Sequence, residues 1–182
     1  MIEKYDNFFT PPIQAQLFNT IIKSTFKIGW EDSEEIQHRM YPCLHSPYTF
    51  EDVKSVEILD VVLDKLKNKN ITINNYIKCV INLTKNMDVN FIHNHPNQVV
   101  FLHYSNLTWN PEWGGETVFY KDNGKDILES SPYTPNRAII FDDLGLNNID
   151  SSILFFIVIT DVKSIDLNFS SKDILFNSSS VV

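Results

Sequence analysis

Two histidines, His93 and His95, lie two positions apart in an aromatic-rich segment, residues 91–120. Side chains at positions i and i+2 of a β-strand point to the same side of a sheet. In an extended segment the two imidazoles therefore face one point, which is suitable spacing for two ligands of a transition metal ion. The pattern predicts a metal site that uses His93 and His95.

Histidines at this spacing are not always metal ligands. Histidines on a polar surface, or hydrogen-bonded within a core, also occur two apart, and Pro96 can turn His95 away from its neighbour. For His103, which lies across a turn from the pair, we expect an imidazole packed into one face of a sheet. A cupin site is the weaker assignment, because it requires a glutamate shortly after the second histidine and residues 96–100 contain none.

The elements that must position these histidines change character near residue 70. Thr10, followed by Pro11 and Pro12, predicts a helix start, because a hydroxyl residue is a good N-cap and proline needs no N–H partner in the first turn. Apolar residues at helical spacing then predict one helix over residues 13–22 and a second that begins after Thr49. Strands are predicted over residues 26–30, 71–83, 90–95, 98–106, 117–120, 127–130, 137–142 and 155–160.

Two helices followed by seven or eight short strands predict a mainly β fold with flanking helices (α+β). The expected arrangement is an antiparallel sandwich or barrel with the helices on one outer face. By length, residues 1–182 form a single domain, with a helical part over about 1–70, a barrel over about 71–162 and a loose tail over about 163–182.

Composition excludes several classes of partner. The net charge is −8, and the only arginines are Arg39 and Arg137, which argues against nucleic-acid binding and against attraction to anionic membranes. The longest apolar run, residues 153–159, is far below the roughly 20 residues of a spanning helix. The first residues show no secretory leader pattern, so the expected location is the cytoplasm. The sequence does not indicate an oligomeric state.

Several motifs between Tyr76 and Asp142, taken in order and with their spacing, resemble the iron(II)/2-oxoglutarate dioxygenase superfamily. The closest resemblance is to its prolyl-4-hydroxylase-like branch. The motifs are Lys78-Cys79-Val80-Ile81-Asn82, the His93/His95 pair, His103-Tyr104-Ser105-Asn106, Trp109, Trp113-Gly114-Gly115-Glu116-Thr117, Phe119-Tyr120, Pro135-Asn136-Arg137 and Ile140-Phe141-Asp142.

The resemblance implies a double-stranded β-helix (jelly roll) with two N-terminal helices packed on one sheet. It implies Fe(II) held by two histidines and a carboxylate, 2-oxoglutarate as cosubstrate, and hydroxylation of a peptidyl or small-molecule C–H bond. By position, His93 matches the first metal histidine and His95 stands where the family usually has an aspartate. Tyr104 matches a tyrosine that contacts 2-oxoglutarate.

The second half of the site departs from the family pattern. Asn147 stands at the position of the distal histidine, and Phe156 at that of the basic residue that pairs with 2-oxoglutarate. A dicarboxylate buried without a cation is strongly disfavoured. A rearranged site would keep the two histidines and take its third ligand from Asp142, Asp143 or Asp150. The alternatives are a non-catalytic β-helix binding module and a chain whose C-terminal segment is not an intact family terminus.

Overall fold

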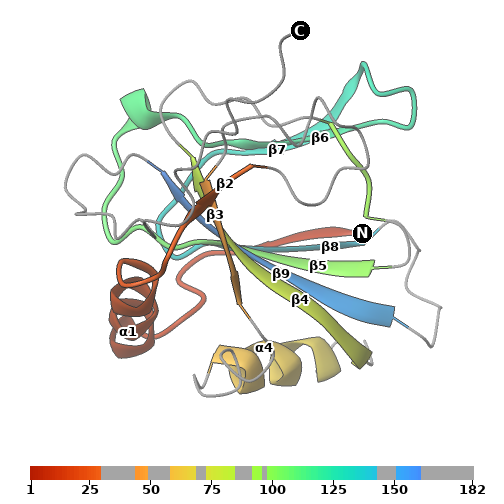
Figure 1. Cartoon of the computed structure of the whole chain (residues 1–182). Coiled ribbons are helices and arrows are strands. Elements are labelled where there is room, and N and C mark those ends of the chain that lie inside the picture. Colours follow the sequence, from red (N-terminus) through yellow and green to blue (C-terminus); the bar gives the residue numbers. More distant parts are fainter. Residues whose placement is uncertain are drawn as a thin grey trace, which may run out of the picture.

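The computed structural model describes residues 1–29, 44–48, 58–68, 73–84, 92–95, 98–142 and 151–160 (Figure 1). Over these residues the chain forms strands, two α-helices and one short 3-10 helix, η1. In chain order they are β1 (Ile2–Tyr5), α1 (Pro11–Ile21), β2 (Lys27–Ile28), β3 (Leu44–Tyr48), α4 (Ile58–Lys67), β4 (Ile73–Thr84), β5 (Gln98–Tyr104), η1 (Pro111–Trp113), β6 (Thr117–Tyr120), β7 (Ile127–Ser131), β8 (Ala138–Asp142) and β9 (Ser151–Thr160).

Seven of the strands form one sheet, in the order β1-β8-β5-β9-β4-β3-β2. Its central strand, β9, runs parallel to both neighbours, β4 and β5, whereas the other pairs in the sheet are antiparallel. The sequence of β9 is apolar almost throughout and contains no charged residue, which is typical of a strand covered on both faces. The sheet is therefore mixed, and not antiparallel throughout as expected, because an apolar run indicates a strand but not its direction.

Alternation along β5 separates the two faces of this sheet. Val99 and Phe101 belong to the cluster of buried side chains that includes residues from both helices. Val100, Leu102 and Tyr104 belong to a second cluster on the opposite face, which we call the inner face. The protein therefore has two apolar layers, one on each side of β5.

Both helices pack on the face of the large sheet opposite the inner face, which we call the outer face (Figure 1). Leu17 and Ile21 of α1, together with Val62 and Leu66 of α4, are buried in the same cluster as Phe101. Burial of these stripes accounts for the two helices, as the helical spacing predicted. Within the described part of the chain, no helix is long and apolar enough to cross a membrane.

The start of α1 agrees with its sequence signal except in one detail. Thr10 occupies the N-cap position and the prolines stand in the first turn, but the Thr10 hydroxyl makes no capping hydrogen bond. The Thr10 carbonyl accepts the first hydrogen bond of the helix, from the backbone N–H of Gln14 at 2.9 Å, as an N-cap carbonyl does.

A second layer, the two-stranded sheet of β6 and β7, lies on the inner face, away from α4 (Figure 1). Phe119 of β6 packs edge-on against Phe141 of β8, with ring centroids 5.0 Å apart. The turn between β6 and β7 contains Gly124 at φ 64°, in agreement with the hairpin turn predicted at Asn123-Gly124. The backbone of this layer therefore crosses the inner face from Tyr104 toward Phe141.

The predicted class, mainly β with helices on one face of a sheet, is confirmed. The predicted strand over residues 90–95 is wrong where it can be checked, because residues 92–95 form no strand. β1 and β3 were not predicted: β1 is short and half charged, and β3 contains Pro47, which is uncommon inside a sheet. The tail over residues 163–182 lies outside the described residues.

Candidate metal site and its surroundings

The two histidines lie in the connection from β4 to β5. This connection stands at the end of the sheet where β5 begins. The backbone N–H of Gln98, the first residue of β5, donates to the carbonyl of His95 at 3.3 Å. The His95 ring lies near Phe141, with ring centroids 6.3 Å apart. Phe141 is the second-last residue of β8 and pairs with Val100 near the start of β5. The histidines therefore lie beside the end of β8.

The two imidazole rings lie against each other although their segment is not a strand. Their ring centroids are 4.7 Å apart and their planes meet at 84°. His93 is exposed and His95 is half-buried. Two imidazoles bound cis to one metal ion at about 2.1 Å place their centroids roughly 4.5–5 Å apart. An edge-to-face aromatic contact has similar geometry, so this arrangement permits a shared metal ion and does not require one.

The first candidate for the third ligand, Asp142, already forms an ion pair through its carboxylate. Its carboxylate Oδ1 accepts from the Met1 ammonium at 3.0 Å, and its side chain is only 4% exposed. The Met1 ammonium also donates to the Asp142 carbonyl at 3.1 Å. Among the residues that the structure describes, no three His, Cys, Asp or Glu side chains are grouped so that they could hold a metal ion.

The other two candidates, Asp143 and Asp150, lie outside the described residues, as does Asn147. Their covalent neighbours are described. Asp142 pairs with Val99 at the start of β5, and Ser152 pairs with Gln98 at the same end of the sheet. The chain on either side of residues 143–150 is therefore paired to the sheet at the end where the two histidines lie.

Tyr104, which the resemblance assigns to 2-oxoglutarate, is buried at the far end of β5. Its hydroxyl donates to Thr117 Oγ1 at 2.7 Å and lies 3.2 Å from the Ser131 carbonyl. Burial raises the pKa of the Tyr104 phenol. Tyr104 lies four positions after Val100, so about 13 Å of strand lies between its backbone and the histidine end of β5.

An aromatic stack fills the inner face around Tyr104. The Tyr133 ring stacks on Tyr104 with centroids 4.3 Å apart, and Trp109 stacks on Tyr133 at 6.1 Å. The Trp109 indole N–H donates to the Gly114 carbonyl at 3.0 Å. Trp109 therefore covers part of the inner face.

His103 is fully buried on the outer face, as expected for an imidazole packed into a sheet. Its Nε2 lies 3.2 Å from Asn136 Oδ1, and its Nδ1 lies 2.7 Å from Ser105 Oγ. Because an amide oxygen only accepts, Nε2 carries the proton and Nδ1 accepts from the serine hydroxyl. Desolvation lowers the pKa of His103 to about 4, although the hydrogen bond to Asn136 raises it.

We predict that His103 makes the stability of the protein fall between pH 6.5 and pH 4. The unfolded chain protonates this histidine near its ordinary pKa of 6.5, whereas the folded protein resists protonation down to about 4. The contribution is complete above pH 6.5 and is lost as the pH falls, by about 3 kcal/mol in total. Urea unfolding as a function of pH measures it. In His103→Asn this part of the pH dependence should disappear, and an unchanged slope would contradict the assignment.

Asn136 links the N-terminal segment to the sheet, and the sequence indicated it only as part of the Pro135-Asn136-Arg137 motif. Its side-chain N–H donates to the Phe9 carbonyl at 2.8 Å, and its Oδ1 accepts from the Phe9 N–H at 3.0 Å. Its backbone φ is 61°, in the left-handed region that asparagine tolerates. The sequence signal that could have indicated a turn is Asn136 soon after Pro135.

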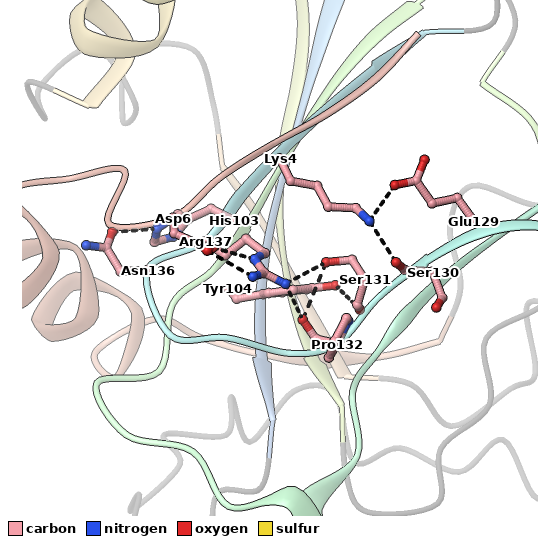
Figure 2. Close-up of polar contacts among 10 residues, drawn as sticks. All are labelled: Lys4, Asp6, His103, Tyr104, Glu129, Ser130, Ser131, Pro132, Asn136 and Arg137. Carbon is pink, nitrogen blue, oxygen red and sulfur yellow. Dashed lines mark hydrogen bonds and ion pairs between the residues drawn. The ribbon is translucent and has the colours of Figure 1, made fainter.

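Polar contacts join β7 to the edge of the large sheet (Figure 2). Lys4 of β1 pairs with Glu129 at 2.5 Å and donates to the Ser130 carbonyl at 2.7 Å. Arg137, just before β8, pairs with Asp6 and also donates to Ser131 and Pro132 of the chain around the end of β7. The sequence indicated Arg137 only as part of a motif.

Iron and 2-oxoglutarate fit this site unequally. The spacing of His93 and His95 fits two of the three ligands of an iron site. 2-Oxoglutarate does not fit the described inner face: the Tyr104 hydroxyl donates to Thr117, the Arg137 guanidinium beside Tyr104 is paired with Asp6, and Lys4 is paired with Glu129.

The chain matches no protein-family model, no curated protein and no solved structure.

Proposed function

We propose that this chain is an oxygenase-like protein of double-stranded β-helix architecture that binds Fe(II) through His93 and His95. The observation that carries the proposal is the 4.7 Å separation of the two imidazole centroids at one edge of the sheet. The reaction class, taken from the resemblance, is hydroxylation of a peptidyl or small-molecule C–H bond. Fe(II), when bound, supplies the redox chemistry that side chains lack.

The residues of the chain would bind and orient the ion. His93 and His95 supply neutral nitrogen ligands, and the nearby Phe141 ring covers one side of the His95 environment. For the third ligand we propose Asp143 or Asp150 in preference to Asp142, because the Asp142 carboxylate is neutralised by the Met1 ammonium. Hydroxylation by O2 also takes two electrons from a cosubstrate, which by the resemblance is 2-oxoglutarate. We assign it no binding residue, because Arg137, the cation beside Tyr104, is already paired with Asp6.

A second candidate is a non-catalytic binding module of the same architecture. The observation that favours it is the stacked arrangement of Tyr104, Tyr133 and Trp109, which fills the described inner face where a cosubstrate would lie. This candidate needs no metal ion, so metal binding separates it from the first.

Anaerobic Fe(II) titration followed by calorimetry tests the proposal. We expect one ion per chain, with affinity reduced about tenfold or more in either Asp143→Asn or Asp150→Asn and little changed in Asp142→Asn. Oxygen uptake by the Fe(II) protein, above that of free Fe(II), would further support an oxygenase. If the folded protein binds no Fe(II), the first candidate is wrong and the binding module replaces it.

A further inference from the structure

One end of the Arg137 guanidinium, Nη1, is held in place by uncharged hydrogen-bond acceptors. Its Nη1 donates to the Ser131 hydroxyl at 3.3 Å and to the Pro132 carbonyl at 3.2 Å (Figure 2). The Arg137 side chain is 15% exposed. The opposite edge of the guanidinium, formed by Nε and Nη2, is therefore fixed in position, and this edge binds carboxylates with two parallel hydrogen bonds.

In this structure the fixed edge holds a carboxylate that belongs to the chain itself. Arg137 Nε donates to Asp6 Oδ1 at 2.5 Å, and Nη2 donates to Asp6 Oδ2 at 3.1 Å. The Asp6 side chain is 56% exposed, so the site opens to solvent on the side from which the carboxylate enters. Asp6 lies in the turn that follows β1, where the next residue, Asn7, has φ 51°.

The surroundings favour an anion at this position. The hydrogen bond and charge of Arg137 lower the pKa of the Asp6 carboxyl. The site is separate from the two histidines, because Arg137 lies five residues before Asp142, or about 16 Å along β8.

We propose that Arg137 is the centre of a carboxylate-binding site, and that Asp6 occupies it as an internal competitor. An external carboxylate, from a small organic acid or from a peptide, would displace Asp6 and make the same two hydrogen bonds. Half-exposed ion pairs contribute little to stability, so competition from Asp6 should weaken external binding by roughly fivefold at most. The proposal does not depend on metal binding at His93 and His95.

The test follows the Arg137 Nε–H signal by ¹⁵N–¹H NMR in the metal-free full chain during titration with succinate. We expect a saturable shift in the wild-type protein and half-saturation at a roughly fivefold lower succinate concentration in Asp6→Asn. In Arg137→Gln the succinate-dependent shifts of the neighbouring backbone amides should disappear. Glu129→Gln, which removes the Lys4 partner without touching Arg137, should behave as the wild type.

A second pair of titrations separates the sources of the carboxylate. One uses an acetylated peptide with a free C-terminal carboxylate, and the other uses the same peptide with an amidated terminus. Tighter binding of the free-carboxylate peptide than of succinate supports the site and identifies peptides as its ligands, whereas tighter binding of succinate supports the site and identifies small acids. Absence of a saturable shift with every carboxylate, in both the wild type and folded Asp6→Asn, would overturn the proposal.

Discussion

Replacing His95 with alanine is expected to lower the affinity of the chain for Fe(II) by about 100-fold or more. Loss of a residue that only supports a metal ligand already costs 10–100-fold in affinity, and loss of a ligand itself should cost at least as much. His93→Ala should have the same effect, because the proposed site uses both neighbouring imidazoles and neither can hold the ion alone. Calorimetric titration under anaerobic conditions measures both.

Asn94→Ala is the matched control, since this exposed residue lies between the two histidines. It changes the same segment without removing an imidazole, so its affinity should stay close to that of the wild type. An equal loss in all three variants would show that the segment matters only through its conformation. Full retention of affinity in His93→Ala and His95→Ala would place the metal elsewhere.

The largest expected effect on stability comes from Phe101→Ala. Phe101 lies at the centre of β5, is buried in the outer cluster, and packs against Phe8 with ring centroids 5.2 Å apart and against Phe9 at 6.4 Å. Removing this ring leaves a cavity between the sheet and the N-terminal segment. We expect the free energy of unfolding to fall by about 4 kcal/mol, measured by urea denaturation.

Leu107→Ala provides the comparison for this prediction. Leu107 is 47% exposed, and truncating it should change the free energy of unfolding by no more than about 0.5 kcal/mol. If Phe101→Ala cost as little as Leu107→Ala, the outer cluster would not be the main core of the protein, and the assignment of the two faces of β5 would be wrong.

The sequence predicted the elements whose signal is local. The helical stripe of α1, the apolar run of β5 and the Asn123-Gly124 turn each depend on neighbouring residues, and each was found where it was expected. β9 was also expected as a strand, although the structure begins it at Ser151 and not at residue 155. The stripe of α1 and the apolar run of β5 both report burial, and residues of both segments are buried in the outer cluster.

Features that depend on distant pairing could not be predicted. The direction of β9 and the incorporation of β1 at the edge of the sheet depend on partners far away in the chain. The pairing of Asp142 with the Met1 ammonium joins the end of β8 to the first residue of the chain, and no local pattern indicates it.

At the site, the structure corrects the local conformation that the sequence predicted. His93 and His95 were expected in a strand, but they lie next to each other in an irregular segment. Pro96, which follows directly, lacks the N–H that a paired strand needs there. The stacking of Tyr104 on Tyr133 could not be inferred either, because Tyr133 lies in the loop between β7 and β8, far from β5 in the sequence.

The most direct test of the central claim is X-ray absorption at the metal edge of the protein loaded with one equivalent of Fe(II) without oxygen. We predict two imidazole ligands, recognised by multiple scattering from their rings, with Fe–N distances of about 2.0–2.2 Å. In the His93→Ala and His95→Ala double variant the imidazole scattering should be lost. Imidazole scattering that persists in this variant, or a wild-type ion surrounded only by oxygen, would contradict the metal site on which the proposed function rests.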